Sequence, residues 1–350
     1  NQCTFRWKLK KFTGLKPADT TALTGILKAP NVAPQTKGML TVPLPATWGQ
    51  YDVLYVTARD PYGREIYTWS WPISLPQRVA ERFMETGSGA ITARDEANRL
   101  TLTASGLTVG WNKKTGMIEG LKNAKNAVSF GNGPVLIGGD DSLKTFRHRD
   151  TLGTHVVELL FEGKHRYRAV WTIYPSGWLK LTYQYRPDNT MDLLGITFAY
   201  PEEQVTGMDL LGNGPYRVWR NRLKGGTLDA WHKTYNDAVT GERWEYPEFK
   251  GYYSHVYGAR LRTKEGGFTV LSGSEAMFLR VLTPTSPKAA NNANTVPAFP
   301  SGGISFMHGI PAVGTKFQKP ETMGPQSQPN MLYANGGTDT LSGVLYFDFR

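Results

Sequence analysis

The sequence has 350 residues, a formal net charge of +11 and a single cysteine. One cysteine excludes an internal disulfide framework and a cysteine-based metal site, and Cys3 alternates with Phe5 and Trp7 as a buried strand residue does. No apolar stretch reaches the eighteen or more residues of a membrane-spanning helix, so we expect no membrane span. The length allows two or three domains.

The positive charge raises the question of whether the protein binds nucleic acid. The lysines and arginines are spread thinly, with no long cluster beyond residues 8–11 (KLKK) and no RNA- or DNA-binding motif. We therefore expect no nucleic-acid partner. A solvated basic surface or an acidic polysaccharide substrate fits this distribution better.

Residues 1–76 alternate between apolar and polar side chains in short runs, as β-strands do. Residues 41–45 and 52–57 are the first runs, and a Pro-Tyr-Gly turn leads into the alternating run at residues 65–71. This pattern predicts a small β-sandwich over residues 1–76. Trp69 and Trp71 share one face of their strand, and we expect them in the core or in a domain interface.

Residues 77–89 are charged and then rich in glycine, which predicts a linker with room for one helical turn. From residue 90 to residue 350 the chain is again almost all strand, for example at residues 100–104, 155–161 and 178–185. The sequence therefore predicts an all-β protein of two units, with one large body of antiparallel strands over residues 90–350.

Residues 211–223 (LGNGPYRVWRNRL) differ from an ordinary surface loop. Gly212, Gly214 and Pro215 predict a tight turn, and three arginines and two large aromatic residues follow. Flat apolar rings can stack on pyranose faces, and guanidinium groups donate to hydroxyls or carboxylates. The run is a candidate sugar-binding segment, although the same side chains would equally serve to join two sheets.

The G-x-G-P pattern at residues 212–215, followed by Asn221-Arg222, resembles a signature of the C-terminal domain of glycoside hydrolase family 2 β-galactosidases. Three further places are similar to that family in the same chain order: residues 5–9 with 25–30, residues 112–116 (NKKTG), and residues 246–251 (YPEFKG). The resemblance covers nearly the whole chain at the level of domain order. It implies an immunoglobulin-like β-sandwich followed by a large galactose-mutarotase-like supersandwich.

A glycosidase of the usual kind holds two carboxylates about 5–5.5 Å apart for retention or roughly 6.5–9.5 Å apart for inversion. In the family this pair lies on a (β/α)₈ barrel, and no strand–helix alternation of that size occurs here. The pairs Asp140-Asp141 and Glu202-Glu203 are neighbours in extended chain, so their side chains point to opposite faces. We expect no catalytic residue in this chain.

The histidines stand apart in the sequence, with no H-x-x-x-H motif, so we expect no metal site and no cofactor. Residues 147–150 (RHRD) are interpreted as a solvated loop. The six histidines are His148, His155, His165, His232, His255 and His308.

Three segments are expected to form the sugar-facing edge: residues 212–222, 246–255 and 314–317. The last lies where the resemblance implies a G-G-D-D-S-W segment, whose tryptophan contributes to the active site of the neighbouring barrel. Phe317 matches that ring in type, and Lys316 replaces the acidic pair, which suits an anionic glycan. Core packing remains an equal alternative for the aromatic members. The predicted carbohydrate-binding residues are Arg217, Trp219, Arg222, Glu248, Tyr252, Tyr253, His255 and Phe317.

The resemblance implies a non-catalytic C-terminal portion of a glycoside hydrolase, which binds carbohydrate and completes the active site of a catalytic barrel in the same parent chain. The alternative is a free-standing carbohydrate-binding or mutarotase-like protein, in which His255 and Glu248 would act as acid and base. A periplasmic or secreted location follows from the same resemblance.

Overall fold

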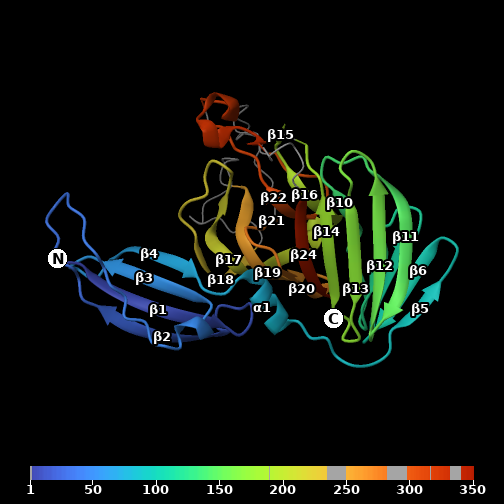
Figure 1. The fold of residues 1–350 in the computed structure, drawn as a ribbon, viewed down its shortest axis with the longest axis horizontal. Helices are drawn as coiled ribbons and strands as arrows, with labels where there is room; N and C mark the ends of the chain where they lie inside the picture. The colour runs from blue at the N-terminus through green and yellow to red at the C-terminus, as the bar shows by residue number, and fades with distance from the viewer. Residues whose placement is uncertain (1, 189, 235–249, 282–297, 316, 332–339) are drawn as a thin grey trace.

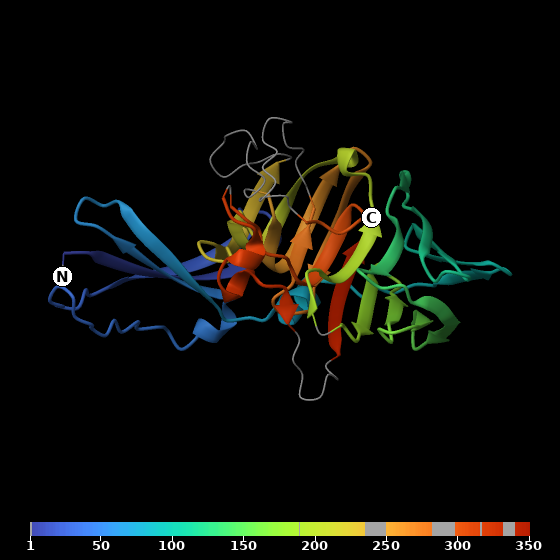
Figure 2. The same ribbon diagram turned by 90° about the horizontal axis from the view of Figure 1, so that it is seen from above.

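The structure, a computed structural model, describes residues 2–188, 190–234, 250–281, 298–315, 317–331 and 340–350. Within these ranges the regular structure is almost all β-strand, and α1 (Pro76–Phe83) is the single α-helix, which confirms the predicted all-β class. No helix among the described residues has the length and apolarity needed to cross a lipid bilayer. The two β regions lie at opposite ends of the long axis, with α1 between them (Figures 1 and 2).

The N-terminal unit is one antiparallel sheet in the order β2-β1-β3-β4. Its strands are β1 (Thr4–Phe12), β2 (Thr20–Leu27), β3 (Val53–Arg59) and β4 (Glu65–Pro72). Among residues 2–76 no second sheet faces it, so the expected two-sheet sandwich is not seen there. Instead Leu40, Val42 and Leu44 from an extended segment pack against a small core around Trp7 and Val56.

Trp69 and Trp71 of β4 are 42% and 48% exposed, so they do not lie in a core, and the alternative of a domain interface stays a prediction. They line an apolar groove of about 400 Å³ together with Leu40, Val42 and other side chains of this sheet. The alternation of β4 correctly put both rings on one face. It could not show that the segment with Leu40 and Val42 leaves both rings partly exposed.

Helix α1 begins at Pro76, whose fixed φ and missing N–H suit the first helical position. The predicted linker therefore contains about two turns of helix. Val79 and Ala80 are buried in a cluster with Tyr257 and Leu271 of the large unit. Arg82, on the last turn, reaches back to the buried Asp52 of the small unit. The helix thus contacts both units.

The large unit holds a five-stranded sheet and a larger one. The smaller sheet runs in the order β5 (Thr92–Asp95), β6 (Arg99–Ala104), β7 (Leu107–Asn112), β8 (Ile118–Lys122) and β9 (Ala127–Val128). Along the larger sheet, as far as it is described, the order is β10 (Gly131–Leu136), β16 (Leu194–Ala199), β22 (Ile304–Gly309), β21 (Phe278–Arg280), β19 (Tyr252–Thr263), β20 (Gly266–Ser272), β24 (Leu341–Asp348), β14 (Leu179–Tyr185), β13 (Arg168–Ile173), β12 (Thr154–Glu162) and β11 (Ser142–Thr151).

Three features complete this architecture. β17 (Val205–Val218) pairs with β18 (Thr227–Thr234) and β19, and the short strands β15 (Thr190–Met191) and β23 (Asn330–Met331) pair with each other. The C-terminal strand β24 pairs with β20 on one side and β14 on the other. The last strand of the chain therefore joins the two halves of the large sheet.

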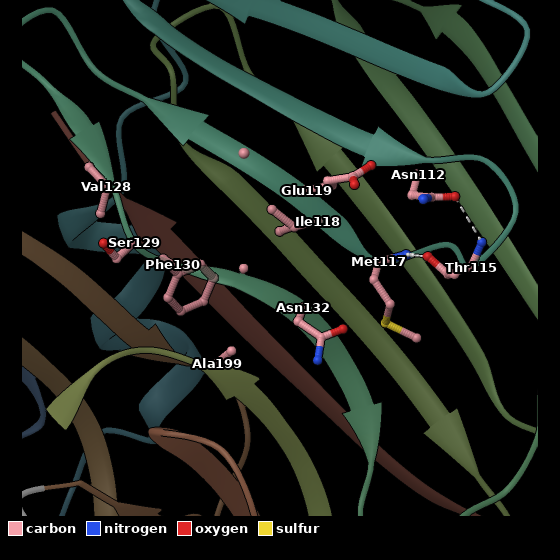
Figure 3. A pocket seen from close by; sticks show the side chains of 12 residues that line it. Asn112, Thr115, Met117, Ile118, Glu119, Val128, Ser129, Phe130, Asn132 and Ala199 are labelled. Atoms are coloured by element: carbon pink, nitrogen blue, oxygen red, sulfur yellow. Dashed lines mark hydrogen bonds between the residues drawn. The ribbon is translucent and has the colours of Figure 1, made fainter.

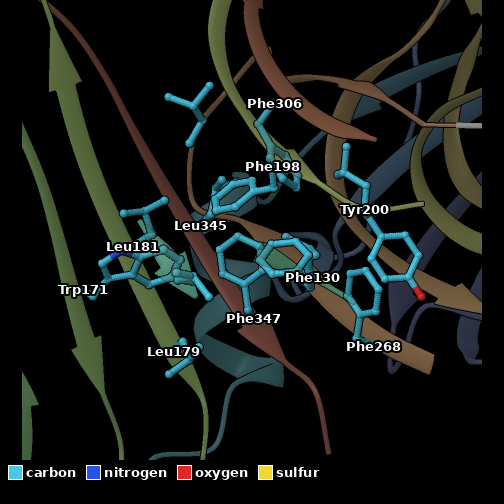
Figure 4. Packing of buried hydrophobic residues seen from close by; sticks show 14 of the residues in the cluster. Phe130, Trp171, Leu179, Leu181, Phe198, Tyr200, Phe268, Phe306, Leu345 and Phe347 are labelled. Carbon is cyan, nitrogen blue, oxygen red and sulfur yellow. The ribbon is translucent and has the colours of Figure 1, made fainter. Parts of the chain in front are cut away.

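An aromatic core includes residues from both sheets of the large unit. Figure 4 shows its part around Phe130, Phe198 and Phe347. Trp111 of β7 meets Trp171 of β13 edge-on, with ring centroids 6.2 Å apart. Phe130 stacks on Phe198 at 4.7 Å. Burial of each such ring contributes about 1.5–3 kcal/mol, so this core is the main source of stability for the large unit.

Candidate functional site

The sequence predicted a tight turn at Gly212 and Gly214. Instead, both glycines lie at a place where neighbouring strands approach closely. Gly212 and Gly214 lie within β17, between β18 and β19. A Cβ on Gly214 would come within 2.7 Å of the Trp231 ring, and one on Gly212 would meet the backbone oxygen of His255 at 3.2 Å. Glycine is needed here because neighbouring groups occupy the space of a side chain.

The turn comes after β17, at Trp219 and Arg222. The Arg222 amide donates to the Trp219 carbonyl at 2.8 Å. Between them, Asn221 bonds the backbone of Val313 twice: its Nδ2 donates to the Val313 carbonyl at 2.9 Å, and its Oδ1 accepts from the Val313 amide at 3.1 Å. The Arg220 amide donates to the Pro311 carbonyl at 3.0 Å. The end of the run is therefore fastened to the chain that leads to Phe317.

Phe317 is presented to solvent by a small hydrogen-bonded turn. The Thr315 hydroxyl accepts from the amides of Phe317 at 3.2 Å and Gln318 at 3.1 Å. The Phe317 side chain is 82% exposed, so the alternative of plain core packing does not apply to it. The Phe317 side chain is thus accessible to solvent.

Trp219, Tyr252 and Tyr253 are buried, in contrast to the predicted sugar-facing role. Trp219 is 1% exposed and packs edge-to-face on Tyr252, with ring centroids 5.5 Å apart. Phe299 contacts both rings, and the Tyr252 hydroxyl donates to the Ala298 carbonyl at 2.6 Å. Rings enclosed in this way have no free face for a pyranose, so the core-packing alternative describes these three residues.

Arg217 is half-buried and lies over the ring of Tyr253, with its guanidinium carbon 5.0 Å from the centroid. Lys250 is buried nearby, and its pKa is lowered by burial and then by the charge of Arg217. The Arg217 guanidinium thus contributes to a positively charged environment beneath the surface, while its ring contact holds it in place.

Two further predicted residues are exposed. Arg222 lies at the end of the turn, and His255 lies on β19 with a positive φ of 48°. Glu248 lies outside the described residues. The structure therefore divides the predicted set into an exposed group and a buried group, rather than one uniform sugar-facing edge. The exposed group consists of Arg222, His255 and Phe317, and the buried or half-buried group of Arg217, Trp219, Tyr252 and Tyr253.

A cavity of about 520 Å³ lies elsewhere, between β8 and β10 (Figure 3). Asn112 and Thr115 at its rim are engaged in their own turn: the Asn112 side chain accepts from the Lys114 amide at 2.8 Å, and the Thr115 hydroxyl accepts from the Met117 amide at 3.3 Å. This is the hairpin that the NKKTG motif resembled. Since the turn uses these polar groups, the cavity is a less suitable polar ligand site than the exposed group.

Histidine–carboxylate pairs are the feature that the sequence did not reveal. His165 Nδ1 lies 2.7 Å from Asp141 Oδ2, and His155 Nδ1 lies 2.7 Å from Asp150 Oδ1. Asp140, Asp141 and His165 have potential ligand atoms within 4.8 Å of one another. Both Asp141 oxygens already accept hydrogen bonds from His165, whereas the buried Nε2 of His165 has no hydrogen-bond partner among the described residues. The histidines stand apart in the sequence, but the fold places His155 and His165 each beside a carboxylate.

No family model matches the sequence, and no curated protein matches it. One solved structure, titled "Crystal Structure Analysis of HI1317", is similar at a TM-score of 0.38 and 9% sequence identity. The match covers 74% of this chain and 100% of that chain. A similarity of this size carries no argument about function.

Proposed function

We propose that this chain is the C-terminal, non-catalytic portion of a β-galactosidase-like glycoside hydrolase, with a mutarotase-like supersandwich as its large unit. It binds carbohydrate and completes the active site of a catalytic barrel in the same parent chain. The observation that carries this proposal is the double hydrogen bond between Asn221 and the Val313 backbone. It joins the motif that resembles the family to the segment that presents Phe317.

The chemistry of the exposed group supports a glycan ligand. Phe317 offers an apolar ring face that water solvates poorly and that the C–H face of a pyranose would cover. Arg222 is exposed beside the same fastened segment and can donate paired hydrogen bonds to hydroxyls or to a carboxylate. The net charge of +11 favours an anionic glycan over a neutral one, because it raises the local concentration of acidic ligands.

We expect Phe317→Ala to weaken glycan binding roughly 2- to 10-fold, the equivalent of one lost ring contact of about 0.5–1.5 kcal/mol. Its melting temperature should stay within error, since the side chain is exposed. Calorimetry against neutral and uronate-containing oligosaccharides measures the effect. Tyr62→Ala is the matched control, because that ring is 84% exposed on the small unit. Equal effects of both substitutions, or none from Phe317→Ala, would contradict the proposed site.

We expect the isolated chain to release no nitrophenol from any nitrophenyl glycoside. Hydrolysis needs two carboxylates placed across the scissile bond, and the sequence supplies no barrel to hold them. The assay compares the purified chain with a mock purification. Turnover above the mock that a single Asp or Glu substitution abolishes would show that the chain is an enzyme by itself.

A further inference from the structure

His148 and His155 form a pair on the outer hairpin of the large sheet. In the register of β11 and β12, His148 lies opposite Val157 and His155 lies opposite Asp150, so the two histidines are diagonal neighbours on one face. Their rings are stacked, with centroids 5.3 Å apart and an interplanar angle of 22°. His148 Nδ1 lies 3.1 Å from His155 Nε2. Residues 147–150 are thus part of a strand, where a solvated loop had been predicted.

Each ring is held from its other side by a carboxylate. His148 Nε2 lies 3.2 Å from Asp95 Oδ2 on β5, and His155 Nδ1 lies 2.7 Å from Asp150 Oδ1. An ionised carboxylate only accepts hydrogen bonds, so the two outer nitrogens carry the hydrogens. The two inner nitrogens of neutral rings therefore both carry a lone pair at this 3.1 Å contact. Such lone pairs repel unless a cation, either a proton or a metal ion, lies between them.

The geometry fits a metal ion. Imidazole nitrogens bind zinc at about 2.0–2.1 Å, so two nitrogens 3.1 Å apart would subtend roughly 100° at the ion. This angle suits neighbouring ligands in tetrahedral or octahedral coordination. The outer carboxylates also match the usual surroundings of metal-bound histidine, whose second ring nitrogen donates to a carboxylate that fixes the ring.

Charge and access are compatible with a bound cation. Asp95 and Asp150 supply two negative charges, of which Lys113 offsets part by an ion pair of 2.8 Å to the other Asp95 oxygen. Arg149 is paired with Glu158 at 2.6 Å. The His155 side chain is almost fully buried, whereas the His148 side chain is 23% exposed. Water can therefore reach the pair from the His148 side and complete the coordination.

We propose that His148 and His155 bind one divalent transition ion, such as Zn²⁺ or Ni²⁺, with water as the remaining ligands. Imidazole ligands favour these ions over Mg²⁺ and Ca²⁺. Through Asp95 the site connects β5 of the five-stranded sheet to the β11–β12 hairpin. Metal binding would therefore brace the two sheets of the large unit against each other. This inference is independent of the proposed glycan site.

The test uses the full chain without a polyhistidine tag, titrated by calorimetry with ZnCl₂, NiCl₂ and MgCl₂. We expect saturable one-to-one binding of Zn²⁺ and Ni²⁺, none of Mg²⁺, and a rise in melting temperature with zinc. His148→Ala should abolish binding and the rise. Asp95→Asn should weaken binding about 10- to 100-fold, because it loosens the orientation of His148. His232→Ala is the matched control, since His232 contacts Asp209 at 2.7 Å and no second histidine ring is described against it.

A spectroscopic measurement identifies the ligands directly. With Cu²⁺ as the probe, electron paramagnetic resonance should show coupling to imidazole nitrogens in the wild type and in His232→Ala, and should lose it in His148→Ala. If the wild type does not bind one metal ion per chain, the proposal is overturned. A proton shared between the two rings would then explain their contact. Equal binding by the wild type and His148→Ala would also overturn it. Melting curves without metal show whether each variant is folded. If His148→Ala does not fold, the weaker binding expected for Asp95→Asn still tests the proposal.

Discussion

Replacing Arg82 by leucine is expected to lower the free energy of unfolding by about 3–5 kcal/mol, the usual cost of removing one partner of a buried ion pair. The Asp52 side chain is fully buried. Its Oδ2 accepts from Arg82 Nη2 at 2.6 Å and from the Phe12 amide at 2.8 Å. Without Arg82 the carboxylate keeps its backbone bond but loses its counter-charge. The charge cannot reach water, so the folded state is destabilised.

The same substitution frees one end of α1. Arg82 Nη2 also donates to the Phe12 carbonyl at 3.1 Å, so the arginine bonds both a side chain and the backbone of the small unit. We expect limited proteolysis to cut Arg82→Leu near residues 84–91 faster than the wild type. Fragments of about 10 and 29 kDa would mark that site, from the share of the 38.9 kDa chain on each side.

Guanidinium chloride unfolding followed by circular dichroism measures the effect of Arg82→Leu. Arg64→Leu is the control, because the Arg64–Asp60 pair of 2.7 Å is a surface pair with the arginine 76% exposed. That substitution should leave the unfolding midpoint nearly unchanged. Asp52→Asn combined with Arg82→Leu should recover part of the stability, since it removes the buried charge. An Arg82→Leu midpoint equal to that of Arg64→Leu would show that α1 is a loosely attached linker.

Trp219→Ala is expected to cost about 3–5 kcal/mol, because it removes a fully buried indole and leaves a cavity. The space would open between Tyr252 and Phe299, whose rings both lie about 5.5 Å from Trp219. From the sequence alone Trp219 was a candidate sugar-binding residue, with core packing as an equal alternative. The burial of the ring favours core packing.

Thermal melts and glycan titrations on Trp219→Ala and Phe317→Ala distinguish the two roles. Trp219→Ala should melt well below the wild type while each folded molecule still binds, and Phe317→Ala should show the reverse. Trp219→Phe, which keeps an aromatic ring, should restore part of the lost stability. A Trp219→Ala variant that melts like the wild type but no longer binds glycan would show that this tryptophan belongs to the glycan site.

The sequence by itself determined the fold class and the positions of many strands. Alternation of apolar and polar residues places successive side chains on opposite faces, and this local rule correctly put Trp69 and Trp71 on one face of β4. The NKKTG motif also specified its turn, since the Asn112 side chain accepts hydrogen bonds from the backbone amides two and three residues later in the chain. These features depend on neighbours in the chain, so they are readable from it.

Only the tertiary structure decided which aromatic residues are covered. Trp219 and Phe317 are similar in character, yet one is enclosed by Tyr252 and Phe299 and the other is held in solvent by the Thr315 turn. The sequence determines on which face of a strand a side chain lies, whereas the burial of that side chain depends on segments far away in the chain. For the same reason His148 and His155, seven residues apart, become a facing pair only when the hairpin register and Asp95 of another sheet position them.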